Sequence, residues 1–278
     1  MVTLWSSSIS ERVFAALCFT ATMVPLLCLL LLLGDAVLAV LPHLSAGPDH
    51  GALPLPALLE ALEGSLRLIV TTALFAVPVG MGVAIYLEEY RHPGLLPLLI
   101  ERSISVLVGV PSIIFGLLGL EIFVLGLRLS SGLLVAALTL ALLVLPLIVV
   151  SSCEALRAVP AMIRDGGHAL GASRFQVVTR LVLPMALPGM LAGALLALAR
   201  GLGEAAPLLV VGSLAHAAIE SGGVMAPYAA LPGHLFSLTV DQGEAPLAAA
   251  CLLVLVSTVL AAHVLGLLVR LRTQREGL

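Results

Sequence analysis

Arg200 and Glu204 are opposite charges that lie four positions apart in an apolar stretch of the sequence. A charge within a membrane span is costly, so such residues face a cavity or one another rather than lipid. The guanidinium offers a rigid fork of donors that matches a tetrahedral oxyanion in two-point contact, and Glu204, one helical turn further on, is placed to orient it. We therefore predict that Arg200 and Glu204 line an anion path. The alternative is a buried ion pair that holds its helix in register.

Arg67, Glu121 and Ser112 are further polar residues within apolar stretches. Arg67 and Glu121 lie at a similar depth, about two helical turns from the ends of their stretches, which favours a structural pair. Ser112 follows Pro111, and a proline removes one backbone hydrogen bond and can open a helix. The Ser112 hydroxyl then either satisfies a freed carbonyl or touches the anion. We include Arg67 and Ser112 in the predicted path.

The sequence lacks the residue patterns of the common catalytic sites. All 13 basic residues are arginine, so the lysine of a Walker A loop or of a Schiff-base enzyme is missing. The four cysteines lie in apolar stretches and the histidines show no ligand spacing, so we expect no metal site. Ser213 and His216 are the nearest approach to a catalytic dyad, but no Gly-x-Ser-x-Gly elbow accompanies them. We predict a chain that is not an enzyme and holds no cofactor of its own.

Apolar blocks long enough to cross about 30 Å of hydrocarbon dominate the chain. Of the 278 residues, 60% are apolar and 10% are charged, and the mean hydropathy is +1.18. The first block exceeds the roughly 7–15 apolar residues of a signal-peptide core, so we interpret it as a retained span. We predict an all-α membrane protein with six transmembrane helices, at 13–33, 66–87, 104–127, 132–153, about 185–211 and 246–269.

The apolar sequence that continues past Glu204 to about Ala218 needs a separate interpretation. A second crossing there would place the basic C-terminus outside, so we predict one crossing followed by a shallow segment. Within the next long loop, the residues from Tyr228 to Val240 favour a short interfacial helix.

The distribution of arginine predicts the orientation in the membrane. With the N-terminus inside, the outer segments hold only Arg128, and Arg67 and Arg200 fall within spans. Because basic residues concentrate in cytoplasmic segments, we predict that both termini are cytoplasmic. We divide the chain into residues 1–62, one helix with an external loop, and a core of five helices at 63–278. The inner segments hold Arg12, Arg91, Arg102, Arg157, Arg164, Arg174, Arg180, Arg270, Arg272 and Arg275.

The longest inner loop, residues 157–184, carries its own helix signals. Pro160 suits the first position of a helix, and Gly171 suits its C-terminal cap. Ser173 and Gln176 have the spacing of a capping box that opens the next helix. We predict two short helices joined at Gly171. Held between two membrane helices, such a unit can transmit a push from a cytoplasmic partner.

The same loop resembles the permease signature of bacterial ABC importers. That signature reads Glu-Ala-Ala, three residues, Gly, nine residues, Ile-x-Leu-Pro. Here Asp165-Gly166-Gly167, Gly171 and the segment 181–184 (Leu-Val-Leu-Pro) stand at the matching places. The resemblance implies that residues 161–172 form a coupling helix that docks on an ATPase subunit. The departure from Glu-Ala-Ala lowers helix propensity by about 1 kcal/mol per glycine. The implied coupling residues are Arg164, Asp165, Gly166, Gly167, His168, Ala169, Leu170 and Gly171.

Three other stretches, 84–90, 109–117 and 200–209, resemble motifs of the PstA-type phosphate permeases in the same order. This resemblance implies the type I ABC importer permease fold and a multi-pass subunit of the bacterial cytoplasmic (inner) membrane. It implies that Arg200 and Glu204 lie near the path of inorganic phosphate. The implied partners are a paralogous PstC-type permease, two PstB-type ATPase subunits that bind the ATP and Mg, and a PstS-type phosphate-binding protein. We expect the lipid bilayer, and not nucleic acid, around the chain.

Two other function classes stay open at this point. The same machine could carry sulfate or molybdate, because composition does not separate these oxyanions. A secondary transporter also has charges at the midplane and broken helices, but it has no reason to carry loop 157–184 with this spacing. An intramembrane hydrolase would depend on Ser213 and His216 alone.

Overall fold

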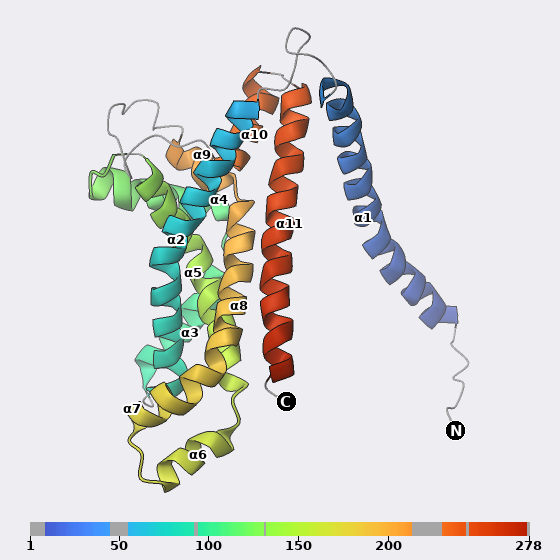
Figure 1. The fold of residues 1–278 in the computed structure, drawn as a ribbon. Helices are drawn as coiled ribbons and strands as arrows, with labels where there is room; N and C mark the ends of the chain where they lie inside the picture. Colours follow the sequence, from blue (N-terminus) through green and yellow to red (C-terminus); the bar gives the residue numbers. More distant parts are fainter. Residues whose placement is uncertain are drawn as a thin grey trace.

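The computed structural model describes residues 9–44, 55–91, 94–130, 132–212, 230–242 and 245–276, and within these ranges it is helical without strands. Figure 1 shows a bundle of long helices with short helices at both ends. The elements are α1 (Ile9–Leu44), α2 (Leu55–Glu89), α3 (Leu95–Leu107), α4 (Ser112–Gly119), the π-helical turn η1 (Leu120–Gly126), α5 (Leu133–Arg157), α6 (Ala161–Ala169), α7 (Arg174–Val177), the π-helical turn η2 (Val178–Val182), α8 (Leu183–Leu202), α9 (Ala206–Gly212), α10 (Leu231–Ser237), the π-helical turn η5 (Leu238–Gln242) and α11 (Ala245–Glu276).

Five helical segments of the described chain are long and apolar enough to cross a membrane: Glu11–His43, Leu55–Glu89, Leu133–Arg157, Arg174–Leu202 and Ala245–Arg272. The bent pair of Pro97–Leu107 and Ser112–Gly126 makes a sixth if it is counted as one span. The predicted all-α membrane fold is therefore confirmed. The predicted boundary between residues 62 and 63 falls inside α2.

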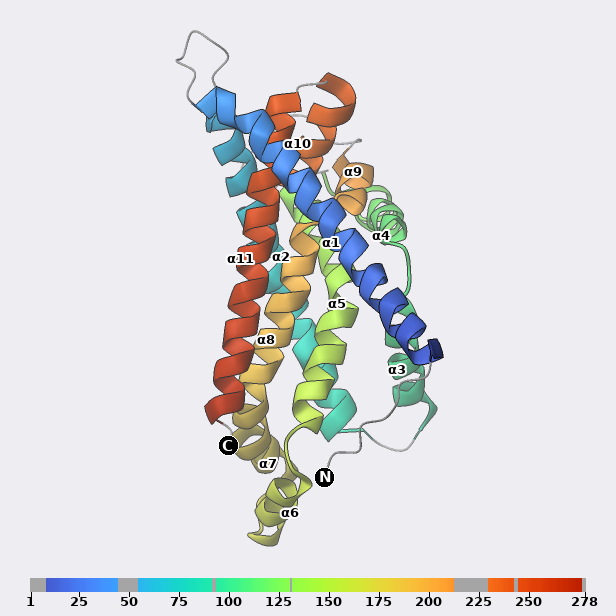
Figure 2. The ribbon, with the colours of Figure 1, turned by 90° about the vertical axis from the view of Figure 1, so that its right-hand side faces the viewer.

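The predicted third span at 104–127 is present as two helices that meet at a break, and the first of them begins earlier, at Leu95. The chain bends by 112° between α3 and α4. Pro111 is the N-cap of α4, and a proline cannot continue the hydrogen bonding of the preceding helix. In both ribbon views α3 lies toward the end that carries α6, whereas α4 lies toward the opposite end beside α9 (Figures 1 and 2).

The fifth span begins earlier and ends earlier than predicted. Ser173 caps α7, and the helix continues through η2 into α8, so the second short helix of the loop is the first part of the span itself. The helix ends at Leu202, with Gly203 as its C-cap, and α9 follows as a separate short helix. One long apolar helix followed by a separate short one is therefore present as far as Gly212. That the short helix lies at a shallow depth in the membrane stays a prediction. The short helix predicted between 228 and 240 is present as α10.

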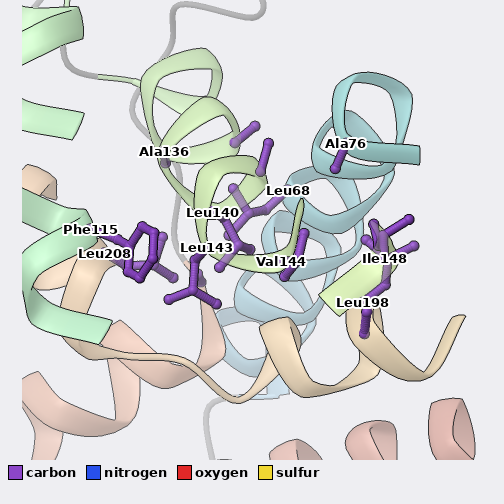
Figure 3. Close-up of a cluster of buried hydrophobic side chains, with 14 of the residues drawn as sticks. Leu68, Ala76, Phe115, Ala136, Leu140, Leu143, Val144, Ile148, Leu198 and Leu208 are labelled. Carbon is purple, nitrogen blue, oxygen red and sulfur yellow. The ribbon is translucent and has the colours of Figure 1, made fainter. Parts of the chain in front are cut away.

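Helix α5 forms the centre of the bundle. Of its apolar window, 67% is buried, against 6% for α11, so most of α5 is covered by α2, α4, α8 and α9. Leu140, Val144 and Ile148 of α5 are fully buried and meet Leu68 of α2 and Leu198 of α8 (Figure 3). A helix that is apolar all round is stable only when it is buried in protein or lipid.

Helix α1 stands apart from the bundle. It contacts α11, and its buried residues Ala36 and Val40 lie near its C-terminal end. The other ends of α1 and α11 separate, as Figure 1 shows. The first residues of α1 and the last of α11 point toward the end that carries α6 (Figures 1 and 2). That this end faces the cytoplasm stays a prediction.

Candidate functional site

Arg200 lies in the last turn of α8, and Glu204 follows the end of that helix. The chain turns there through hydrogen bonds from the Gly203 and Glu204 amides to the carbonyls of Arg200 and Gly201. Arg200 Nε is 3.9 Å from Glu204 Oε1, and the side chain of Arg200 is 55% exposed while that of Glu204 is 20% exposed. The pair is therefore loose and open on the arginine side. This geometry does not fit the alternative of a buried pair that serves only to fix the helix.

Arg200 also lines a cavity of about 740 Å³ between α5, α8 and α11. These three helices lie side by side in Figure 2. The cavity follows α8 from Met185 to Arg200, which at 1.5 Å per residue is about 22 Å. Its other polar lining residues are Ser151, Glu154, His263 and Arg270.

The remaining predicted path residues lie elsewhere in the described chain. Arg67 forms an ion pair with Glu63, one turn away on α2, and both side chains are mostly exposed. The predicted pair of Arg67 with Glu121 is therefore wrong. Ser112 begins α4 at the bend, and neither it nor Arg67 is among the residues that line the cavity.

Close approach of the helix backbones shapes the same region. A Cβ added at Gly201 would lie 2.9 Å from Val144 Cγ1 of α5, and one added at Gly193 would lie 2.5 Å from Ser151 Cβ. Small residues let membrane helices pack closely where no hydrophobic effect drives their association. Gly201 therefore serves contact with α5, whereas Gly203 has only looser neighbours at 3.7 Å or more.

The coupling loop, residues 157–184, contains the predicted helix start and cap signals. Pro160 precedes α6 as its N-cap, so the helix begins one residue later than predicted. Gly171 has a positive φ of 79°, which a residue without a side chain adopts readily. Ser173 and Gln176 form the predicted capping box in both directions.

The coupling residues fall into an inner and an outer group. Arg164 points inward to Glu89 of α2, and Gly167 is buried against Val177 and Leu181. Asp165 is exposed and has no hydrogen bond or ion pair within the described part of the chain. The other exposed residues of this group are Gly166, His168, Ala169, Leu170 and Gly171.

Apolar side chains are exposed beside these residues. Met162 is 81% exposed, Leu170 is 90% exposed and Phe175 is 67% exposed. Large apolar side chains gathered on a protruding surface mark a contact site for another protein.

Residues 76–274 match the family described as binding-protein-dependent transport system inner membrane component. The chain belongs to this family. The matched region contains α5 and α8 with the cavity between them, the coupling loop and Arg200. The chain is accordingly a multi-pass permease of the inner membrane.

Curated relatives of this chain include permeases named for phosphate transport. The phosphate transport system permease protein PstA of Haemophilus influenzae is 32% identical over 203 residues, which cover 72% of each chain. The protein named PstA 1 of Mycobacterium tuberculosis is 38% identical over 157 residues, 56% of this chain and 51% of the relative. The chain thus spans about half the length of the mycobacterial relatives that it matches.

Solved structures with the same fold are ABC importers. The inward-facing methionine transporter MetNI has a TM-score of 0.60 at 20% identity, covering 80% of this chain and 94% of that one. A bacterial alginate ABC transporter in complex with its periplasmic protein has a TM-score of 0.58 at 12% identity. The match covers 98% of this chain and 99% of that one. The fold is that of the type I ABC importer permeases.

Several polar residues that line the cavity were not predicted from the sequence. Glu154 and Arg270 lie near the C-terminal ends of their helices, where charged residues are ordinary, and His263 is a single histidine on α11. Only the packing of α5, α8 and α11 brings them to the cavity with Arg200. Within the described residues no group of three or more His, Cys, Asp or Glu could hold a metal ion. Ser213 and His216 lie outside the described residues.

Proposed function

We propose that the chain is the transmembrane permease subunit of an ATP-driven importer that carries inorganic phosphate into the cytoplasm. The observation that carries this proposal is Arg200, which is half exposed and loosely paired beside a cavity bounded by three membrane-spanning helices. A guanidinium that is not saturated by its carboxylate partner keeps donors free for an oxyanion. Relatives named as phosphate permeases support phosphate over sulfate or molybdate.

The proposed machine divides its tasks among several chains. Two PstB-type ATPase subunits bind ATP and Mg, and a PstS-type protein delivers the anion. A PstC-type permease completes the membrane part. Closure of the ATPases pushes α6, and the membrane helices rock so that the site near Arg200 opens alternately to each side. Asp165, Met162 and Leu170 are the exposed side chains that we assign to ATPase contact.

The experiment is uptake of labelled phosphate by vesicles that contain the complete complex, with sulfate and molybdate as competitors. Arg200→Ala should abolish uptake while the complex still assembles, because the anion loses its positive partner within the membrane. Arg67→Ala is the matched control, since Arg67 lies outside the cavity and pairs with Glu63. Normal uptake by Arg200→Ala would contradict the assignment of Arg200 to the anion path. If sulfate or molybdate competed more strongly than unlabelled phosphate, that anion would replace phosphate as the assigned substrate.

A further inference from the structure

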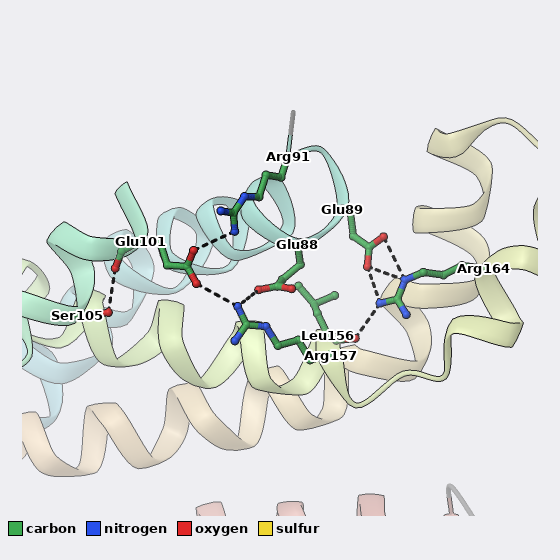
Figure 4. Close-up of polar contacts among 8 residues, drawn as sticks. All are labelled: Glu88, Glu89, Arg91, Glu101, Ser105, Leu156, Arg157 and Arg164. Atoms are coloured by element: carbon green, nitrogen blue, oxygen red, sulfur yellow. Dashed lines mark hydrogen bonds and ion pairs between the residues drawn. The ribbon is translucent and has the colours of Figure 1, made fainter. Parts of the chain in front are cut away.

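The last two residues of α2 and the residue that follows them connect the coupling loop to the membrane helices. Glu88, Glu89 and Tyr90 are consecutive, and we call them the α2 terminus. Each contacts a different element: Glu88 contacts α5, Glu89 contacts α6 and Tyr90 contacts α7. Figure 4 shows the two carboxylates pointing to opposite sides, toward Arg157 and Arg164. The stretch 84–90 stood out in the sequence without a role in binding the anion.

Glu89 and Arg164 form the most buried of these ion pairs. Arg164 Nη2 donates to Glu89 Oε1 at 2.7 Å, and Arg164 Nε donates to the same oxygen at 3.1 Å. The Glu89 side chain is only 7% exposed. Two donors of one guanidinium on a buried carboxylate fix both distance and direction, which a single exposed ion pair does not.

Arg164 also holds the end of α5. Its Nη2 donates to the Leu156 carbonyl at 2.9 Å, and its Nη1 donates to the Val159 carbonyl at 2.7 Å. A basic side chain at a helix C-terminus satisfies carbonyls that have no partner within the helix. One side chain of α6 therefore ties α2 and α5 together.

Glu88 extends the connection into the membrane helices. It pairs with Arg157, the last residue of α5, at 2.7 Å. Arg157 also reaches Glu101 of α3 at 3.4 Å, and Glu101 pairs with Arg91 at 2.9 Å. These outer pairs are much more exposed than that of Glu89, because the Arg157 side chain is 57% exposed. They link α2, α3 and α5 at one end of the bundle.

Tyr90 contacts the other arm of the loop. The guanidinium carbon of Arg174, the first residue of α7, lies 5.5 Å from the centre of the Tyr90 ring, within the range of a cation–π interaction. The α2 terminus thus holds both arms of the coupling loop, on either side of Gly171.

We propose that the α2 terminus is the joint through which a displacement of α6 moves α2 and α5, with Glu89 and Arg164 as its positioning residues. The inference rests on the proposed importer function, since it takes the displacement of α6 from a partner ATPase. Because Arg164 contacts α2 and α5 at once through short, partly buried bonds, α6 cannot shift alone without breaking them. The push therefore reaches the helices that enclose the cavity.

The test is the ratio of phosphate transported to ATP hydrolysed in the reconstituted complex. Glu89→Gln removes the charge and keeps the shape, so the ATPases still bind α6 and hydrolyse ATP, but the ratio falls by about tenfold. The double variant Glu89→Leu with Arg164→Met replaces the buried pair by apolar groups of similar size, which preserves folding, and should show the same fall. Arg67→Gln, which breaks an exposed pair with Glu63 on the same helix but outside this link, is the control and keeps the ratio.

A second measurement needs no substrate. In the wild-type complex, a non-hydrolysable ATP analogue should change amide hydrogen exchange in α6 and at the end of α2 alike. In both variants the change should stay within α6. A ratio within about twofold of wild type in both variants, or an exchange change that still reaches α2, overturns the proposal. Because the exchange experiment contains no anion, a wrong choice of phosphate would leave its result unaffected.

Discussion

At the residue scale, three arginines show how surroundings decide a role. Arg67 has an exposed partner one turn away, a pair worth about 0–1 kcal/mol. Arg164 has a buried carboxylate and two carbonyls, and breaking such a buried pair costs about 3–5 kcal/mol. Arg200 has one carboxylate at 3.9 Å and an open side. Of the three, only Arg200 lines the cavity, where its free donors can meet an anion.

Arg200→Lys tests whether the fork or only the charge of Arg200 matters. Lysine keeps the positive charge but presents a point charge without two-point geometry. We expect uptake to persist with an apparent affinity for phosphate about tenfold weaker, equivalent to about 1.4 kcal/mol. Concentration-dependent uptake in vesicles measures this change. An affinity equal to that of wild type would mean that charge alone is sufficient.

At the element scale, close packing and breaks in helices define the site. The bend before Pro111 directs α4 away from the line of α3, and α4 packs on α9. The two backbones lie so close that a Cβ at Gly116 would be 2.8 Å from Pro207 Cα. Helix α8 ends at Leu202, so Glu204 lies outside the helix, in the turn that follows it. Small residues set the distance of α2 and α8 from α5. A bundle in lipid depends on such contacts, because lipid is as apolar as the core.

Gly80 and Gly82 of α2 provide a matched test of this packing. A Cβ at Gly80 would lie 2.7 Å from Ile148 Cγ2 of α5, whereas one at Gly82 meets nothing within 4 Å. Gly80→Ala should destabilise the protein by about 1–3 kcal/mol through overpacking. Gly82→Ala should stabilise it by about 0.5–1 kcal/mol through helix propensity. Thermal unfolding of the two variants in detergent measures both, and a loss of stability in Gly82→Ala would contradict this account.

At the scale of the whole molecule, the chain exposes surfaces that suit a larger assembly. Helices α6 and α7 protrude at one end, beyond the last turns of α2 and α5 (Figure 1). They carry the exposed apolar side chains of Met162 and Phe175. Helix α1 is nearly all exposed along its first half. Helices α5, α8 and α11, which lie side by side in Figure 2, line a cavity of about 740 Å³. These features agree with a permease that functions with partner chains.

Leu170→Asp tests the protruding surface. Burying a leucine at an interface contributes about 1.5–3 kcal/mol, so the charge should weaken copurification of the ATPase by tenfold or more, about 1.4 kcal/mol. Leu95→Asp is the control, because Leu95 on α3 is also highly exposed, at 77%. Immunoblots of the purified complex compare the two. Equal retention of the ATPase in both variants would exclude this surface as the docking site.

Local signals allowed much of the fold to be predicted from the sequence. Span length follows from hydropathy, and the turn between α6 and α7 follows from Gly171 and the Ser173 capping box, because each depends on a few neighbouring residues. Arg200 and Glu204 were found as charges in apolar sequence. The angle at Pro111 could not be predicted, because a proline permits a range of bends and its neighbours choose one.

The sequence by itself determined that the chain is a helical membrane protein, and it allowed the coupling loop and an anion-binding role for Arg200 to be predicted. These properties depend on composition and on short-range spacing. Only the tertiary structure decided that Arg200 shares a cavity with Glu154, His263 and Arg270, and that Arg164 faces Glu89, 75 residues away, instead of a partner. The physical reason is that helices in a bundle meet by the packing of small residues around α5, and a contact between distant segments leaves no local pattern in the chain.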